Sequence, residues 1–201
     1  MFQRELAKIN GPVTDFIRKH ITTGSPIGIT AETYFELRRQ VSGHFKIHPS
    51  AVVVVGSMKL GFSLKAKSKL KGVAGSRFMP FDGDSDVDVA VVSSQLFDLY
   101  WDELFKISGP RAQNVYENEA RKSVVIGLFS GWIAPSELPS SPRSERAEAW
   151  RKFFDQLTLA RVCGLRPIKG RLYRDWSRLE AYQALMVQEC RAALSEGKPE
   201  K

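Results

Sequence analysis

The sequence has few of the residues that build disulfide frameworks and metal centres, and it has no long apolar run. Only two of its 201 residues are cysteine and three are histidine. Cys163 and Cys190 lie in apolar, helix-like stretches without a nearby histidine, which argues against a zinc site and favours two buried thiols. No apolar run approaches the ~18 residues of a membrane-spanning helix. The charged N-terminus lacks the apolar segment of a signal peptide, so we expect a cytoplasmic protein with no membrane partner.

Several familiar catalytic motifs are also missing. No arrangement of serine, cysteine and histidine suggests a hydrolase triad. The sequence contains neither a Gly-x-Gly-x-x-Gly run nor a Walker lysine motif, and it has no internal repeat. These absences argue against the common triad hydrolases, dinucleotide-binding domains and P-loop proteins.

The bulk composition is that of a folded, basic protein. Hydrophobic residues make up 43% of the chain and charged residues 26%, which is ordinary for a globular domain. The length suits a single domain over residues 1–201, with no need for a disulfide to stabilise it. The formal net charge of +8 suits a polyanionic partner, either a triphosphate or a nucleic acid.

Hydrophobic periodicity predicts alternating helices and strands. We expect helices over about 2–20 (broken at Gly11-Pro12), 30–43 (capped by Thr30), 94–107 (capped by Ser94), 144–163 and 174–195. Strands are expected over 51–55, 87–92 and 123–133, with a shorter one near 168–173. The fold class is therefore α/β or α+β, with a short mixed sheet flanked by helices, a core over about 45–135 and a helical C-terminal part over about 144–195.

Two acidic residues open the predicted strand 87–92. Asp86 and Asp88 are two positions apart, so their side chains project to the same face, while Val87, Val89 and Val91 point to the other and anchor the strand. Two carboxylates held this close repel each other unless a cation lies between them. Mg²⁺ or Mn²⁺ prefers carboxylate and phosphate oxygens and would supply that cation. The pattern indicates a metal site at Asp86 and Asp88 that is shared with a phosphorylated ligand.

A small-residue turn follows the predicted strand 51–55. Gly56 lets the backbone approach phosphate oxygens without a Cβ in the way, and the Ser57 hydroxyl can donate to a phosphate oxygen. Lysines follow from Lys59 onward, over a basic segment that extends to Arg77, and can neutralise the remaining charge. Each piece alone is more often a plain turn or a solvated surface. Their combination, however, favours a nucleotide site with Gly56, Ser57 and Lys59 on the phosphates.

These residues resemble a known family. Residues 54–57 (VVGS) and 85–92 (SDVDVAVV) are similar to the signature of the DNA polymerase β-like nucleotidyltransferases, which include small stand-alone members. The resemblance covers about residues 51–92. It implies that Gly56 and Ser57 hold a triphosphate, that Asp86 and Asp88 ligate the metal ions, and that the fold is a short mixed sheet flanked by helices.

Two features depart from the family pattern. The connection from Ser57 to Asp86 is longer than usual, and its basic excess could fold over the nucleotide, contact an RNA or protein acceptor, or be disordered. The family also carries a third carboxylate on a later strand, whereas the predicted strand 123–133 contains no acid. Asp84, Glu117 and Glu119 are the candidates for that additional acid.

Two aromatic segments have alternative interpretations. Trp150, Phe153 and Phe154 favour a helix packed in the core over a base-stacking platform. Residues 171–178 (RLYRDWSR) could stack on a nucleobase or bind a phosphate backbone, but a solvated basic helix face is favoured.

The predicted function is a metal-dependent transfer of a nucleoside monophosphate from a nucleoside triphosphate to a hydroxyl on protein, RNA or a small molecule. The alternative is a nucleotide- or nucleic-acid-binding module of the same fold without turnover, which the missing acid favours. A homo-oligomer or a neighbour-encoded partner protein could complete the acceptor site. The expectation of a partner comes from the resemblance, since small members of that family often work in toxin–antitoxin or defence systems.

Overall fold

The computed structural model of the chain describes residues 2–9, 11–66, 76–82, 85–108, 119–138 and 144–195. Within these ranges the helices are α1 (Phe2–Ala7), α2 (Val13–Ile17), α3 (Ala31–Phe45), α4 (Gly56–Leu60), α5 (Ser94–Ser108), α6 (Glu119–Ser130), α7 (Glu145–Leu159) and α8 (Trp176–Ser195). The strands are β1 (Val52–Val55), β2 (Val87–Val92), β3 (Trp132–Ile133) and β4 (Ile168–Tyr173). The expected α+β class is confirmed.

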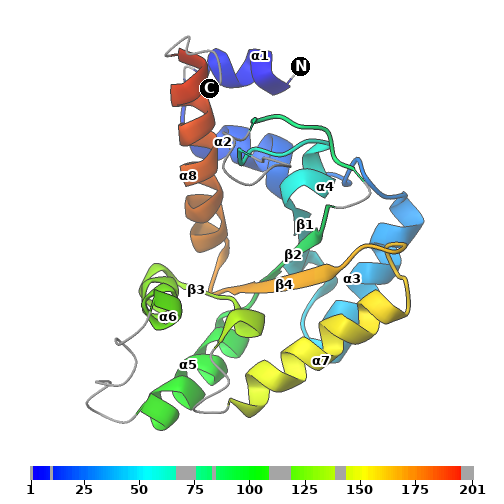
Figure 1. Cartoon of the computed structure of the whole chain (residues 1–201), viewed down its shortest axis with the longest axis vertical. Coiled ribbons are helices and arrows are strands. Elements are labelled where there is room, and N and C mark those ends of the chain that lie inside the picture. The colour runs from blue at the N-terminus through cyan, green and yellow to red at the C-terminus, as the bar shows by residue number, and fades with distance from the viewer. Residues whose placement is uncertain are drawn as a thin grey trace.

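The strands form one mixed sheet in the order β1-β2-β4-β3 (Figure 1). β1 pairs with β2 in antiparallel orientation, and β2 pairs with β4 in parallel orientation. The short β3 joins the outer edge of β4 only near Leu172 and Tyr173, so the first part of that edge has no strand beside it within the described residues. The strand that carries the acidic pair is therefore central and fixed on both sides.

One face of the sheet is closed by three helices. Alternate residues of β1 and β2, with Ile168 and Leu172 of β4, form a single apolar cluster with side chains of α3, α5 and α7. Trp150, Phe153 and Phe154 of α7 lie in this cluster, which confirms their predicted place in the core. Gly170 of β4 faces the same helix, where an added Cβ would collide with the Phe154 ring. Close contact between α7 and the sheet explains the glycine in this strand.

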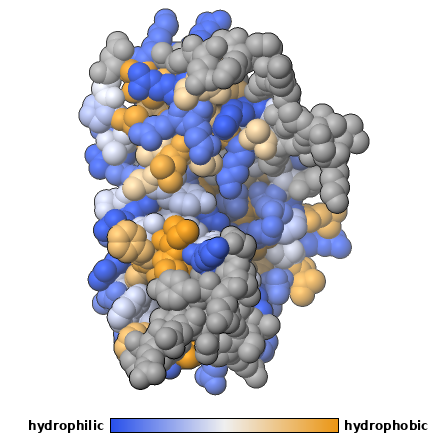
Figure 2. Space-filling model, turned by 60° about the vertical axis from the view of Figure 1, so that its left-hand side comes forward, coloured by the Kyte–Doolittle hydropathy of each residue, from blue (hydrophilic) through white to orange (hydrophobic). Residues whose placement is uncertain are grey.

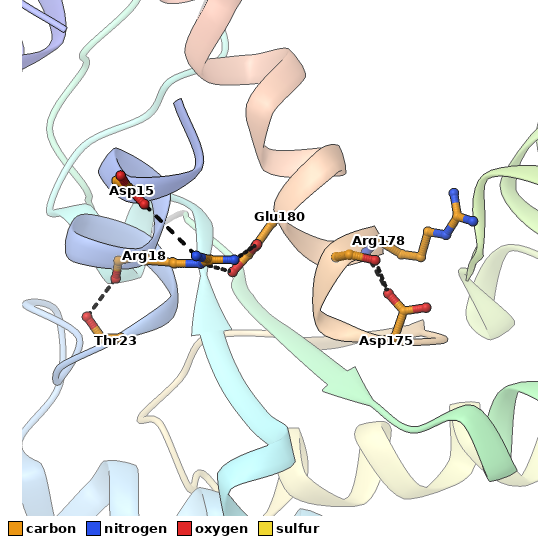
Figure 3. Close-up of polar contacts among 7 residues, drawn as sticks. Asp15, Arg18, Thr23, Asp175, Arg178 and Glu180 are labelled. Carbon is orange, nitrogen blue, oxygen red and sulfur yellow. Dashed lines mark hydrogen bonds and ion pairs between the residues drawn. The ribbon is translucent and has the colours of Figure 1, made fainter. Parts of the chain in front are cut away.

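The opposite face is covered only in part. Val53, Val55, Ala90, Val92 and Tyr173 pack against residues of α1, α2 and α8. The helical turn that follows α2, Arg18–Thr22, is tied to α8 by Arg18, whose guanidinium donates to both oxygens of Glu180 at 2.8 and 2.9 Å (Figure 3). This charge-assisted bidentate bond holds α8 over the far end of the sheet. Near Asp88 this face borders a cleft, and Tyr182, Gln183 and Met186 of α8 form part of its lining.

Helix caps explain two of the boundaries. Thr30 caps α3 as expected, because its side chain accepts a bond from the Thr33 N–H at 3.1 Å. The expected cap at Ser94 is wrong by one residue. The Ser93 hydroxyl accepts the bond from Leu96 N–H at 3.3 Å, and Ser94 is the first helical residue.

The predicted strand over 123–133 is wrong, because most of it is helix α6. Only Trp132 and Ile133 are extended. Val124 and Leu128, four residues apart, are the ones that pack against the closed-face cluster, whereas Ile126 and Phe129 are exposed. That spacing selects a helix over the β-preference of the Val-Val-Ile run, and Gly131, at φ +80°, ends it.

The side of the molecule on which α6 and α8 lie is mostly hydrophilic, with smaller hydrophobic groups between (Figure 2). Among the described residues, no helix combines the length and the apolar character needed to cross a bilayer.

Candidate functional site

The Gly-Ser turn and the acidic pair meet where β1 ends and β2 begins. Val55, the last residue of β1, pairs in register with Asp88 of β2, so the chain turns into α4 directly beside the Asp88 side chain. Gly56 takes φ +70°, and a Cβ built there would lie 2.5 Å from Asp88 Oδ2. Only glycine fits between the turn and the carboxylate without displacing it.

A cleft of about 600 Å³ opens at this point. Gly56, Ser57, Asp86 and Asp88 all line it, so the structure brings together four of the residues that the sequence singled out. Ser57 is nearly buried in its wall. The faces of β2 are as expected, because Val87, Val89 and Val91 lie in the closed-face cluster while Ala90 lies in the other.

The environment of Asp88 disfavours its charge. Part of the side chain remains accessible to water, but the surrounding protein atoms displace much of its hydration and raise the pKa of Asp88 above its usual value. The charge of Asp86 acts in the same direction, while Arg171, Lys65 and Lys169 act against it. A cation in the cleft would therefore stabilise the ionised pair.

Strand β4 adds two cations to the cleft, and of these the sequence reasoning missed Lys169 and favoured a solvated helix face for Arg171. Lys169 pairs in register with Asp88, and Arg171 pairs with Ala90. The Lys169 ammonium donates to Asp86 Oδ2 at 2.6 Å, and this bond raises the pKa of Lys169. The alternation of apolar and charged residues over 168–173 (IKGRLY) was the available signal, because it places both cations on one face of a strand.

Arg171 is held rigidly in the wall of the cleft. Its guanidinium lies 5.0 Å from the Trp132 ring centroid and 4.9 Å from that of Tyr182, and it donates to the Tyr182 hydroxyl. Its buried Nε has no hydrogen-bond partner among the described residues.

The favoured interpretation of residues 171–178 as a solvated helix face is wrong for its first part, because Arg171 and Tyr173 belong to strand β4. α8 begins only at Trp176.

Lys59 does not reach the cleft. It is 4% exposed, and its ammonium donates to the carbonyls of Thr23 and Gly24, the latter at 2.6 Å. This lysine joins α4 to the preceding loop, and we do not propose it as a nucleotide ligand. Lys65, further along the predicted basic segment, does line the cleft.

The described residues do not test the three candidates for an additional acid. Asp84 and Glu117 lie outside the described residues, and Glu119 is the first residue of α6. Glu137 and Asp155 also line the cleft, and Glu137 lies 3.7 Å from the Arg171 guanidinium. Within the described ranges, however, no three His, Cys, Asp or Glu side chains are grouped closely enough to hold a metal ion.

The two aspartates alone suit a divalent ion that takes its remaining ligands from elsewhere. Mg²⁺ is commonly held by one or two carboxylates together with waters and substrate phosphates. Asp86 and Asp88 fit that description, because they share a face and their charges interact inside a cleft. They are the residues that would hold Mg²⁺ or Mn²⁺.

Comparisons with protein-family models, with curated proteins and with solved structures find no match to this chain.

Proposed function

We propose that the chain is a metal-dependent nucleotidyltransferase whose cleft binds a nucleoside triphosphate. The observation that carries this proposal is the contact between the Gly56 backbone and the Asp88 carboxylate, with Asp86 in the same cleft. A phosphate chain needs backbone that it can approach closely, a hydroxyl or amide donor, and positive charge. Gly56, Ser57 and the cations around Asp88 supply these three things within one cavity.

The residues divide the work by position. The Ser57 hydroxyl would donate to a terminal phosphate oxygen, and Arg171, packed against two aromatic rings, would neutralise charge on the phosphate chain. Asp86 and Asp88 would hold the divalent ion, which when bound supplies charge stabilisation at the reacting phosphate. Lys65, exposed at the edge of the cleft, adds a further charge for the ligand or the acceptor.

The reaction would be a displacement at the α-phosphorus. The acceptor oxygen bonds to that phosphorus as its bond to the pyrophosphate oxygen breaks, and the hydroxyl proton leaves to water in the open cleft. The neighbouring strand β4 carries Lys169 and Arg171 on this face instead of a carboxylate that could take the proton. We therefore expect slow turnover that rests on positioning and charge neutralisation.

Pyrophosphate release tests this proposal. The full chain is incubated with Mg²⁺, each labelled nucleoside triphosphate in turn, and RNA, protein and small-molecule acceptors. Asp86→Asn and Asp88→Asn should each lower release by at least about 100-fold, because each removes a ligand that stabilises charge. Asp102→Asn, a change on the exposed face of α5 outside the cleft, should have no effect. Equal release from the wild type and Asp86→Asn would contradict the proposal.

A second candidate function is nucleotide binding without transfer. The bond of Lys169 to Asp86 favours it, because a cation already pairs with one of the two aspartates that a metal ion would need. This candidate requires nucleotide binding that Asp88→Asn weakens, together with no pyrophosphate release for any acceptor. If the ligand is instead an RNA, neutralising the lysines of the basic segment, Lys65 among them, should weaken binding and flatten its salt dependence.

A further inference from the structure

Lys169 bonds to one of the two carboxylate oxygens of Asp86, a residue that would also hold the metal ion. β4 lies parallel to β2, and this register puts the Lys169 side chain over the acidic pair. Its Nζ lies 2.6 Å from Asp86 Oδ2, at a site where the lysine side chain is 62% exposed and the aspartate side chain 35%. Among the described residues, Asp86 is the only bonding partner of this ammonium.

The cleft is consequently balanced in charge without a metal ion. Asp86 and Asp88 repel each other, and Lys169 offsets the charge of Asp86 while Arg171 acts on Asp88. A divalent ion held by Asp86 would be repelled by the adjacent ammonium, because both carry positive charge. Lys169 and the metal ion therefore compete for the same carboxylate.

The two cations of β4 differ in how they are held. Arg171 packs against both the Trp132 and Tyr182 rings and bonds to the Tyr182 hydroxyl, so it cannot change partner without breaking those contacts. Lys169 has a flexible four-carbon stem, solvent around it and a single bond. Of the two, only Lys169 can change partner at low cost.

We propose that Lys169 is a resident counter-ion of Asp86 that moves to a phosphate oxygen when a metal-bound triphosphate enters the cleft. This inference rests on the proposed function and adds a mode of binding to it. The metal ion alone must displace Lys169 with nothing to receive the ammonium, so it binds weakly. The triphosphate receives the ammonium, so metal and nucleotide strengthen each other's binding. By linkage, the coupling is the same in both directions.

Manganese binding tests this role with a readout that needs no catalysis. Free Mn²⁺ is measured by electron paramagnetic resonance with the full chain, in the absence and in the presence of ATP. Lys169→Met keeps the length and removes the charge, and Lys152→Met is the matched control. Lys152 forms a similar ion pair, with Glu148 at 3.0 Å, but on the exposed surface of α7.

In the wild type and in Lys152→Met, ATP should tighten Mn²⁺ binding markedly. Lys169→Met should bind Mn²⁺ alone about tenfold more tightly, and the tightening by ATP should fall by about the same factor, a change of about 1.4 kcal/mol in the coupling. Thermal melting of each variant confirms that it is folded, and Lys169→Gln, a shorter neutral side chain, should reproduce the change. Mn²⁺ affinities and ATP coupling equal in Lys169→Met and the wild type would overturn the inference.

Failure of the proposed function would look different. If Asp86→Asn and Asp88→Asn leave Mn²⁺ binding of the Lys169→Met form unchanged, the metal does not bind the pair, and both the site and the role of Lys169 are refuted. If Lys169→Met shifts Mn²⁺ binding as expected but no acceptor supports pyrophosphate release, the counter-ion role stands and the transferase proposal does not.

Discussion

The two faces of the sheet, built from the same strands, differ because one is packed in the apolar core and the other borders the cleft. Along β2, Val87, Val89 and Val91 enter a cluster closed by three helices, while Asp86 and Asp88 point into an open cleft. Along β4, Gly170 lies against the Phe154 ring, while its neighbours Lys169 and Arg171 face the cleft. A period of two lets each strand serve both purposes, so changes on one face should affect stability and changes on the other should affect binding.

The largest effect is expected from a cavity on the closed face. Trp150 is fully buried in the cluster, and its indole N–H donates to the Gly170 carbonyl at 3.3 Å. Trp150→Ala should lower the free energy of unfolding by about 3–5 kcal/mol, measured by urea denaturation. Lys169→Met, one position from that carbonyl but on the open face, is the control and should change it by no more than about 1 kcal/mol, because it removes an exposed ion pair. Similar losses of unfolding free energy in both variants would contradict the difference between the two faces.

The second-largest effect on stability is expected from a substitution at Gly56, in the turn that follows β1. Gly56→Ala puts a Cβ on Asp88 Oδ2 and forces a left-handed backbone on alanine, so it should cost about 1–2 kcal/mol of stability and also weaken nucleotide binding. Gly43→Ala is the matched control, because Gly43 lies inside α3 with nothing within 4 Å of an added Cβ. That substitution should stabilise the protein by about 0.5–1 kcal/mol. Parallel urea titrations of both variants measure the difference, and a neutral Gly56→Ala would show that the turn and the carboxylate are not in contact.

A smaller effect is expected at the start of α7. The Ser144 hydroxyl accepts the Ala147 N–H at 3.1 Å and donates to Glu103 at 2.8 Å, which caps the helix that closes the apolar face. Ser144→Ala should cost about 1 kcal/mol in thermal or urea unfolding and leave nucleotide affinity unchanged. Loss of affinity without loss of stability would show that the two faces are not independent.

The smallest effect expected is a pH dependence of stability that comes from Asp88. Because the pKa of Asp88 is raised above 3.8, the folded protein holds this proton more tightly than the unfolded chain does. The contribution of Asp88 to stability is therefore fully present below pH 3.8 and is lost as the pH rises through its folded pKa. Asp88→Asn should melt at a higher temperature than the wild type near neutrality and gain nothing below pH 3.8.

Glu36, on the outer surface of α3, should contribute to stability with the opposite pH dependence. Bonds from Arg39 and Gln40 lower its pKa to about 2, so its stabilising contribution is present near neutrality and is lost as the pH falls through about 2. Glu36→Gln should therefore melt slightly lower than the wild type at neutral pH.

For Asp88, the contradicting result is a loss of stability in Asp88→Asn near neutrality, which would refute the desolvation of the Asp88 carboxyl.

The sequence predicted the strands of the cleft because their residues leave little choice. Four consecutive valines and the alternating Val87–Val92 segment are extended as expected, and Asp86 and Asp88 lie beside Gly56-Ser57. The segment 123–133 was assigned wrongly, since its β-branched run indicated a strand while packing of Val124 and Leu128 selects a helix. The strand near 168–173 was expected and is present as β4, but its place beside β2 was not predicted. Pairing between β2 and β4, which brings in Lys169 and Arg171, is a long-range contact without a local signal.

The contacts of Lys59 are a second example of long-range packing that the local sequence did not predict. Its place after the turn suggested a phosphate contact, but the backbone carbonyls of Thr23 and Gly24 hold its ammonium inside the fold. No local pattern indicates that a loop more than thirty residues earlier in the chain returns to this helix.

Nuclear magnetic resonance of the labelled full chain tests the central claim most directly, by following backbone amide shifts during titration with ATP and Mg²⁺. The largest and saturable shifts should come from the amides of Gly56, Ser57 and Val87–Val89 and from those of Lys169–Arg171, and Asp88→Asn should abolish them. Shifts centred on another surface, or shifts that persist unchanged in Asp88→Asn, would contradict nucleotide binding in this cleft.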